Sequence, residues 1–438
     1  MPTGQKGPEN GRPVFWEVIV TSIKFAHRMQ HLRSSDIREI LKVTADPEII
    51  SFAGGLPAPE LFPVEELRRI ADEVLRLEGH RVLQYSTSEG DPELRGLLAD
   101  RLTDKLGAST VPDEVLITCG SQQGLDLTGK LLLDEGDVVL CESPTYLGAI
   151  QAFRAYEPTF VEVATDDDGM LPDDLERRLS EHGRVKLVYV VPDFQNPTGR
   201  CWSLTRRKQL LELANRYGVP VVEDAPYAEL RFAGEPVPPL KALDTEGRVI
   251  FLGTCSKIFC PGIRIGWIVA NPDLLGKFVL AKQGVDLHTS SLSQRLLAVY
   301  LRDDDPDARI VRICDTYRER RDLMVKALAE EMPPDVGFTR PDGGLFLWAT
   351  LPPEISARDV LVRSVDRRVA FVPGGSFFPN GGNENTMRLN FSNTAPKRIS
   401  DGVRRLARAV REAAGAHGSD LASANERRPA EAGAGTRG

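Results

Sequence analysis

The sequence is poor in cysteine, and the cysteines it has are dispersed. Six occur in 438 residues, and no two form a close CxxC pair. Neither the dense cysteine pattern of a disulfide-stapled domain nor the Cys/His spacing of a zinc site is present. We therefore expect reduced thiols, as in a cytoplasmic protein, and no metal site. The positions are Cys119, Cys141, Cys201, Cys255, Cys260 and Cys314.

The sequence also lacks a basic excess and any long apolar run. Its 55 lysines and arginines are outnumbered by 63 aspartates and glutamates, which gives a net charge of -8. A face that binds nucleic acid would need the opposite balance, so no nucleic-acid partner is expected. No run of about 18 apolar residues suggests a membrane span. Residues 1–13 are polar and rich in Gly and Pro, unlike a signal peptide. We expect a cytoplasmic protein without membrane contact.

What is present is an ordinary globular composition, with 41% hydrophobic and 27% charged residues in a chain long enough for two domains. The middle of the chain alternates apolar runs with helical patterns, and Gly218 is a predicted helix terminator. Strands buried on both faces and separated by helices favour an α/β fold with a mainly parallel sheet. The predicted strands are residues 115–118, 138–141, 185–191, 219–222, 249–252 and 265–270, and two of the predicted helices are residues 122–133 and 203–217.

The pattern changes after about residue 305, which indicates a smaller α+β domain. It consists of a long helix at 307–332, strand-like pieces at 344–349, 369–372 and 387–391, and a final helix at 400–414. The predicted division is an N-terminal extension, partly disordered, at 1–33, a small domain at 34–65 and 320–415, a large domain at 66–319, and a disordered tail at 416–438. The terminal segments are small, polar and low in complexity.

Polar side chains follow three of the predicted strands directly. Ser121 and Gln122 come after one strand, Asp224 closes another, and Ser256 and Lys257 follow a third. In sheets of this kind, ligands bind beyond the carboxyl ends of the strands. We therefore expect these side chains to share one site.

Lys257 lies beside an apolar strand and among small and hydroxyl-bearing residues, whereas most lysines are solvated at the surface. A partly desolvated lysine has a lowered pKa, so its neutral amine can form a Schiff base with an aldehyde. Thr254 and Ser256 add hydroxyl groups, and Arg264 adds a fixed positive fork. Such groups suit a phosphate.

Ser-Lys at residues 256–257, followed by Pro-Gly-x-Arg-x-Gly at residues 261–266, resembles the cofactor-lysine motif of the class I/II aminotransferases, which are fold-type I pyridoxal-phosphate enzymes. Residues 51–63 are similar to the branch that contains 2-aminoadipate aminotransferases, and the likeness covers residues 34–415. The resemblance implies a large domain with a mainly parallel seven-stranded sheet between helices, plus a smaller α+β domain. It also implies pyridoxal 5'-phosphate as cofactor. The implied reaction moves an amino group between an L-amino acid and a 2-oxo acid through a Schiff base on the catalytic Lys257.

The resemblance also assigns residues to the ring of the cofactor. Asn196, in the Asn-Pro-Thr-Gly segment 196–199, and Tyr227 contact its phenolic oxygen. Asp224 contacts the ring nitrogen and keeps it protonated, so that the cationic ring accepts electrons from the substrate Cα. Tyr146 stacks on the ring. Taken alone, these residues are also compatible with a turn, a helix cap and a core tyrosine.

The phosphate of the cofactor is assigned to Ser121 and Gln122 at a helix start, together with Thr254, Ser256 and Arg264. An ordinary serine N-cap is the alternative for Ser121.

The remaining assignments concern substrate and assembly. Arg388, an arginine between apolar strand residues, holds the substrate α-carboxylate, and Gly55 adds a backbone contact. A structural ion pair is the alternative for Arg388. Ser35 and Arg38 match a helix that selects the substrate side chain, although Arg38 also fits an exposed helix face. Tyr85 matches a tyrosine that reaches the phosphate across a dimer interface, which implies a homodimer.

Two other functions remain open. The same scaffold hosts eliminations, replacements and carbon–carbon bond formation, for instance in natural-product biosynthesis, and the matched residues serve these reactions equally well. Some transcription regulators carry this body behind a winged-helix domain, but the roughly 34 residues before the body are too few for one.

Overall fold

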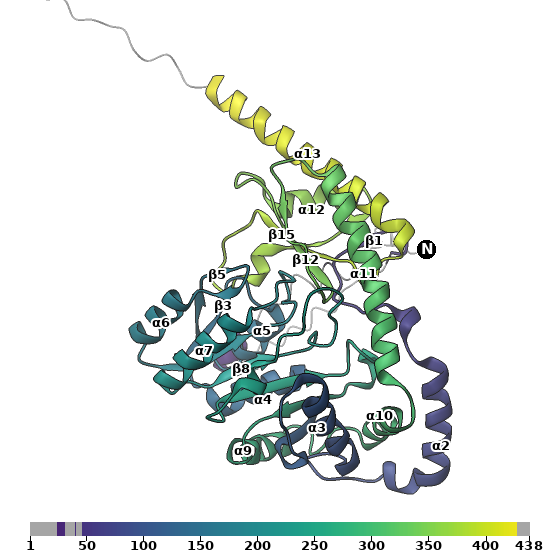
Figure 1. The fold of residues 1–438 in the computed structure, drawn as a ribbon. Helices are drawn as coiled ribbons and strands as arrows, with labels where there is room; N and C mark the ends of the chain where they lie inside the picture. The colour runs from purple at the N-terminus through teal and green to yellow at the C-terminus, as the bar shows by residue number, and fades with distance from the viewer. Residues whose placement is uncertain (1–23, 31–39, 41–45, 427–438) are drawn as a thin grey trace, which may run out of the picture.

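The structure is a computed structural model, and it describes residues 24–30, 40 and 46–426. Figure 1 shows a larger part, in which helices surround a central sheet, and a smaller part built around β12 and β15. Helix α11 runs along the side of both parts, and α13 lies across the smaller one. The α/β fold expected from the sequence is confirmed.

The larger part contains a seven-stranded sheet. Its strands are buried throughout most of their length, as the continuous apolar runs predicted. Only β10 is antiparallel to its neighbours in this sheet, because the loop 255–265 between β9 and β10 is too short for a crossover helix. That loop carries Lys257. In spatial order the strands are β2 (Val115–Thr118), β10 (Gly266–Val269), β9 (Val249–Thr254), β8 (Val221–Asp224), β7 (Val185–Val190), β3 (Val138–Glu142) and β4 (Thr159–Val163).

Helices cover this sheet, and their ends follow local sequence signals. In α7 the Ser203 hydroxyl accepts a hydrogen bond from the Arg206 N–H at 3.3 Å, and Gly218 ends the helix in the left-handed region at φ 69°. The helices are α2 (Val64–Val82), α3 (Pro92–Leu106), α4 (Ser121–Leu132), α5 (Leu147–Arg154), α6 (Pro172–Glu181), α7 (Leu204–Tyr217), α8 (Leu240–Leu243), α9 (Pro272–Gln283) and α10 (Ser291–Asp303). A two-stranded ribbon pairs β5 (Thr165–Asp166) with β6 (Gly169–Met170).

The smaller part has a four-stranded sheet and a separate two-stranded one. The strand expected at 369–372 is divided between them, because Phe371 lies between two short strands that pair in different sheets. The four-stranded sheet is β11 (Gly337–Phe338), β12 (Phe346–Thr350), β15 (Thr386–Asn390) and β14 (Val372–Pro373), and the other pairs β1 (Ile50–Ser51) with β13 (Val369–Ala370). Helices α11 (Pro306–Glu331), α12 (Ala357–Asp366) and α13 (Pro396–Glu426) complete it.

Helix α11 connects the two parts. Near its start the Cys314 thiol donates to the Glu229 carbonyl at 3.6 Å, which belongs to the larger part. At its end, Glu331 contacts Arg404 and Arg411 of α13. The domain boundary expected between residues 319 and 320 falls inside this continuous helix, so the division into domains remains a proposal.

Helix α13 extends beyond its predicted end. It continues to Glu426, so residues 416–426 are helical although they were expected in a disordered tail. The rest of that tail and residues 1–23 lie outside the described residues.

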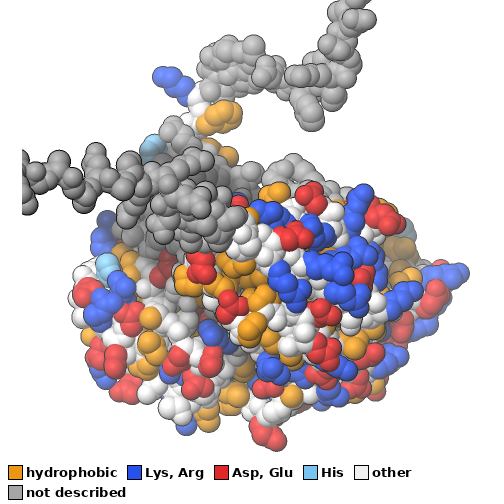
Figure 2. Space-filling model, turned by 90° about the horizontal axis from the view of Figure 1, so that it is seen from above, with side chains coloured by type: hydrophobic (Ala, Val, Ile, Leu, Met, Phe, Trp, Pro, Cys, Tyr) orange, Lys and Arg blue, Asp and Glu red, His pale blue; other side chains and the backbone are white. Residues whose placement is uncertain are grey.

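The outer face of the smaller part mixes both signs of charge. Figure 2 shows basic and acidic side chains next to one another on the described surface, with apolar side chains between them. One such pair joins Arg405 to Asp401 at 2.6 Å on α13. Among the described helices, none combines the length and the apolar character that a membrane crossing requires.

Candidate active site

A cavity of about 370 Å³ opens at the carboxyl ends of the central strands. Twelve residues predicted from the sequence line it together, although they come from segments spread over more than 300 positions. Val191, Pro226 and Phe346 also line it and were not predicted. The twelve are Gly55, Ser121, Gln122, Tyr146, Asn196, Asp224, Tyr227, Thr254, Ser256, Lys257, Arg264 and Arg388.

Lys257 projects into this cavity from the loop between β9 and β10. Its Nζ donates a hydrogen bond to the Gly55 carbonyl at 2.9 Å. Burial, together with the positive charges of Arg388 and Arg264, lowers the pKa of Lys257 from 10.5 to about 8, and the Asp224 charge partly opposes this shift. A substantial fraction of the amine is therefore neutral near pH 8, and the neutral amine is the nucleophilic form.

Asp224 ends strand β8 and is buried at the cavity wall. Its Oδ2 accepts a hydrogen bond from the Tyr189 hydroxyl at 2.9 Å, whereas its Oδ1 has no partner among the described residues. Burial raises the pKa of Asp224 to about 6, and the Tyr189 hydrogen bond and the Lys257 charge oppose this rise. A buried acceptor without a donor is costly, so Oδ1 fits a protonated ring nitrogen placed in the cavity.

The start of α4 forms an anion-binding end of the cavity. Its N-cap is Gly120, so the serine N-cap considered for Ser121 is wrong and Ser121 is the first helical residue. Arg264 lies directly against this turn, and its Nη2 donates to the Cys119 carbonyl at 3.3 Å. Gly266 packs so closely that a Cβ there would lie 2.5 Å from the Ser121 nitrogen. Free N–H groups at a helix start and an adjacent guanidinium suit a phosphate.

Two hydroxyl groups extend this end of the cavity. Thr254 Oγ1 donates to Ser256 Oγ at 2.9 Å, or to the Ile265 carbonyl at 3.1 Å. Both threonine and serine side chains are buried. Thr254 is the last residue of β9, and Ser256 directly precedes Lys257, so the end of one strand and the loop after it supply the hydroxyls and the amine.

Arg388 reaches the opposite wall from strand β15. Its Nη1 donates to Asn196 Oδ1 at 2.8 Å, and its Nη2 donates to the Ala53 carbonyl at 2.6 Å. Its guanidinium lies 4.3 Å from the centre of the Phe346 ring. Burial lowers the pKa of Arg388 to about 10. In the described part of the chain no carboxylate pairs with Arg388, so the structural ion pair is not its role there.

Two tyrosines complete the wall. Tyr227 is buried and hydrogen-bonded to Asn196, and burial raises its pKa above the usual value of 10.0. Tyr146 precedes α5, and burial followed by the Asp224 charge raises its pKa to about 12. Gly148 leaves room for the Tyr146 ring, since a Cβ there would lie 2.5 Å from the Tyr146 hydroxyl oxygen.

Tyr85, which was also predicted for the site, does not line this cavity in the described chain. Tyr85 is 80% exposed and lies edge-on to His288, with ring centres 5.9 Å apart. Ser35 and Arg38 lie outside the described residues. Sequence reasoning in turn missed Tyr189, because an apolar strand run conceals a residue whose importance depends on a hydrogen bond across the sheet.

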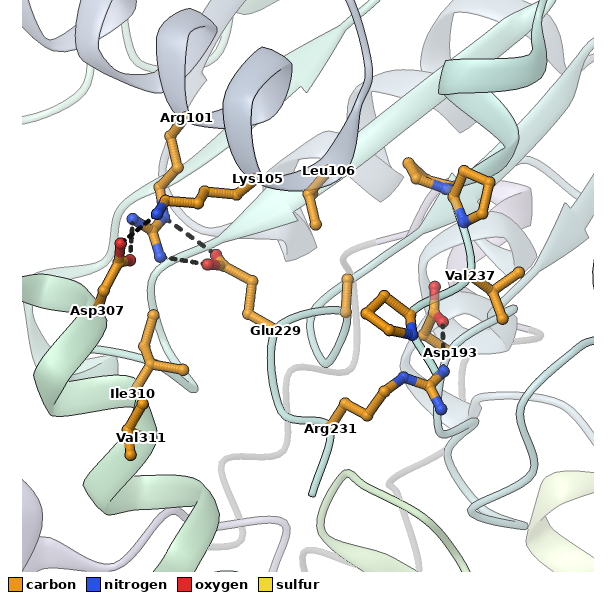
Figure 3. A pocket seen from close by; sticks show the side chains of 14 residues that line it. Arg101, Lys105, Leu106, Asp193, Glu229, Arg231, Val237, Asp307, Ile310 and Val311 are labelled. Atoms are coloured by element: carbon orange, nitrogen blue, oxygen red, sulfur yellow. Dashed lines mark hydrogen bonds and ion pairs between the residues drawn. The ribbon is translucent and has the colours of Figure 1, made fainter. Parts of the chain in front are cut away.

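A second cavity of about 510 Å³ is lined in part by two of the loops that form the site. Asp193 precedes Asn196, and Glu229 follows Tyr227, and both line this second cavity (Figure 3). Arg101 pairs with Glu229 and, at 2.9 Å, with Asp307. These ion pairs tie the loop that contains Glu229 to α3 and α11.

Comparison with known proteins agrees with this geometry. The family model described as "Aminotransferase class I and II" matches residues 52–406. An aromatic-amino-acid aminotransferase of Thermococcus litoralis is 46% identical over 89% of this chain and 94% of its own length. The solved structure of Pyrococcus horikoshii kynurenine aminotransferase has a TM-score of 0.85 at 44% identity, covering 89% of this chain and 97% of the other.

A second solved structure carries a ligand of the expected kind. The α-aminoadipate aminotransferase of Thermus thermophilus, complexed with N-(5'-phosphopyridoxyl)-L-leucine, has a TM-score of 0.83 at 44% identity. The match covers 90% of this chain and 98% of the other.

Proposed function

The chain belongs to the class I and II aminotransferases, and on that basis we propose which of its residues perform the transfer and on which substrates. It is a pyridoxal-phosphate-dependent aminotransferase, which moves an amino group between an amino acid and a 2-oxo acid. The observation that supports the residue roles is that one cavity is lined by the Lys257 amine, the Asp224 carboxylate, the anion-binding start of α4 and Arg388.

The cavity offers suitable groups to both polar ends of the cofactor, the ring with its nitrogen and phenolic oxygen, and the phosphate. Asp224 would meet the ring nitrogen with its free Oδ1, and Asn196 and Tyr227 would hold the phenolic oxygen. Tyr146 would cover one ring face. The phosphate would lie against the α4 start, and its ligands would be Ser121, Gln122, Thr254, Ser256 and Arg264.

Bound pyridoxal phosphate supplies a cationic ring that withdraws the electron pair left when the substrate Cα loses its proton. Lys257 supplies the covalent attachment point and, once its Nζ is free, the base that takes this proton and returns it. The lowered pKa of Lys257 keeps a substantial neutral fraction of the amine available for this step. Arg388 orients the substrate through its α-carboxylate, and Gly55 adds a backbone contact.

We propose amino acids with aromatic or long side chains as donors. Relatives of this chain are named as aminotransferases of aromatic amino acids, kynurenine and α-aminoadipate. Phe346 lies beside Arg388 at the cavity wall and offers an apolar surface to a large side chain. Ser35 and Arg38 are proposed to contact the far end of that side chain.

Isotope transfer tests both the reaction and the donor. The protein is mixed with ¹⁵N-labelled phenylalanine, kynurenine, 2-aminoadipate or aspartate and with 2-oxoglutarate, and labelled glutamate is measured. We expect label transfer from the first three and much less from aspartate. Lys257→Ala should abolish it, while Lys326→Ala, whose side chain is 72% exposed, should not.

Each contrary result has a distinct meaning. Turnover by Lys257→Ala at the normal rate would contradict the lysine assignment. Release of ammonia, or loss of the donor side chain without labelled glutamate, would instead favour the elimination and replacement chemistry of the same scaffold. Transfer from aspartate alone would contradict the proposed donor class.

We also propose a homodimer and a cytoplasmic location. Tyr85, Leu83 and Leu287 are 80%, 71% and 54% exposed, and such apolar surface suits a subunit interface. Tyr85 would then reach the phosphate of the partner subunit. Free cysteines in the described part of the chain are compatible with the reducing cytoplasm.

A further inference from the structure

Tyr189 is a buried tyrosine that touches the site without lining it. It lies on β7, is 1% exposed, and is not part of the cavity wall. Its ring meets the Phe153 ring edge-on with centres 5.7 Å apart. Its hydroxyl donates to Asp224 Oδ2 at 2.9 Å. A buried tyrosine hydroxyl needs such a partner, and here the partner is the carboxylate that faces the cofactor site.

The sheet fixes this contact. Strands β7 and β8 are parallel neighbours, and Tyr189 is paired with Val222, two residues before Asp224. Side chains two positions apart on a strand share one face, so Tyr189 and Asp224 project to the same side of the sheet. The contact therefore depends on two adjacent strands that are buried at these positions, rather than on a loop.

The hydrogen bond has a defined direction. Burial, and then the neighbouring Asp224 charge, raise the pKa of Tyr189 well above 10.0, so the hydroxyl keeps its proton and donates. Burial raises the pKa of Asp224, whereas the Tyr189 hydrogen bond from β7 and the charge of Lys257, in the loop after β9, lower it. Besides burial, the charge of Asp224 in turn raises the pKa of Tyr146 and of Tyr227. Of these, Tyr189 is hydrogen-bonded to the carboxylate in this structure.

We propose that Tyr189 is a positioning residue for transamination, because its hydroxyl holds Oδ2 of Asp224 and leaves Oδ1 aimed at the ring nitrogen of the cofactor. The inference rests on the proposed role of Asp224. A carboxylate held in this way stays ionised and fixed in plane, and it keeps the ring nitrogen protonated. Without the hydroxyl, Asp224 rotates and binds a proton more readily, and the ring nitrogen loses part of its charge.

Tyr189→Phe removes only the hydroxyl, and Tyr156→Phe is its matched control. Tyr156 donates to Asp126 Oδ1 at 3.0 Å, so both variants lose one tyrosine–aspartate hydrogen bond. Pyridoxal phosphate bound to each protein is titrated with pH by its absorbance, and the dissociation constant and melting temperature are measured. Tyr189→Phe should raise the titration midpoint, because an uncharged ring holds the neighbouring imine proton more tightly, and should weaken pyridoxal phosphate binding by about tenfold. Tyr156→Phe should change only the melting temperature.

The variant Asp224→Asn distinguishes the proposed role of Tyr189 from the proposed role of Asp224. If Asp224→Asn shifts the titration and Tyr189→Phe leaves both the midpoint and the dissociation constant at their wild-type values, the role of Tyr189 is overturned while that of Asp224 stands. If Asp224→Asn also leaves them unchanged, the proposed role of Asp224 fails, and with it the basis of the inference. A lower kcat with an unchanged KM in Tyr189→Phe would agree with positioning of the ring.

Discussion

The chemistry of this protein depends first on how single residues are surrounded. Lys257, Asp224 and Arg388 have ordinary side chains, yet burial shifts the pKa of each in the direction that favours the uncharged form. The effect is useful for Lys257, whose neutral amine is the reactive form, and is opposed for Asp224 by the Tyr189 hydrogen bond. The sequence neighbours of Lys257 indicated its desolvation, but the effect of Arg388, Arg264 and Asp224 on its pKa depends on the cavity that brings these charges together.

The lowered pKa of Lys257 predicts how capture of the cofactor depends on pH. Below its pKa of about 8 the amine is mostly protonated, so the capture rate should rise with pH and level off above that value. An exposed lysine would instead continue to gain about tenfold per pH unit until near its ordinary pKa. The measurement is the absorbance change after cofactor-free protein is mixed with pyridoxal phosphate at different pH values.

The charge of Asp224 supplies an internal check on that profile. Asp224 raises the pKa of Lys257, so Asp224→Asn should move the midpoint of the profile to lower pH. A rate that continues to rise well beyond pH 8 in the unmodified protein would contradict the buried, electropositive surroundings of Lys257.

At the scale of elements, the ends of strands and helices deliver these groups. The turn from β2 into α4 presents free backbone N–H groups, and the end of β9 with the loop after it presents Thr254, Ser256 and Lys257 to the same cavity. Arg264 lies in the left-handed region at φ 57° as it ends a short 3₁₀ helix (η4, Pro261–Ile263), which brings its guanidinium to the α4 start. The close approach of these segments needs glycine at Gly120 and Gly266.

Gly120→Ala tests this arrangement. Gly120 has φ 73°, and a Cβ there would lie 2.5 Å from Arg264 Nη2, so the guanidinium must move away from the proposed phosphate position. We expect pyridoxal phosphate to bind about tenfold more weakly, together with a loss of stability of about 1–2 kcal/mol from the left-handed backbone. Affinity is measured by titrating cofactor-free protein, and stability by thermal unfolding.

Gly96→Ala is the matched control for this substitution. Gly96 lies within α3, where a Cβ would meet no atom within 4 Å. Alanine is the better helix former, so this variant should be as stable as the original or slightly more stable, with unchanged affinity. Equal affinities of the two variants for pyridoxal phosphate would count against a phosphate site at the start of α4.

At the scale of the whole molecule, the site joins segments from both parts of the fold. Arg388 and Asn196 are 192 positions apart in the chain, and their 2.8 Å hydrogen bond links the smaller sheet to a loop of the larger one. Lys257 and Gly55 are 202 positions apart and form a second such link. The exposed Tyr85 and its apolar neighbours suggest a third link, to a second copy of the chain.

Mixed dimers test that third link. Tyr85→Phe and Lys257→Ala subunits are unfolded, mixed in equal amounts and refolded at limiting pyridoxal phosphate. If Tyr85 serves the partner, each mixed dimer contains one site with both native residues, and about a quarter of the normal activity should appear on random assembly. If Tyr85 serves its own chain, or the protein is monomeric, mixing should give no gain over the average of the two variants.

The sequence by itself determined the local features: the order of strands and helices in the middle of the chain, the motif around Lys257, the family likeness and the helix stop at Gly218. These features follow from apolar periodicity, turn residues and short motifs, which are local and can be recognised in a single sequence. Only the tertiary structure decided the division of residues 369–372 between two sheets, the position of Tyr189 against Asp224 and the free Oδ1 beside it. Each of these depends on which distant segments pack together, and a single sequence does not encode such contacts in any local pattern.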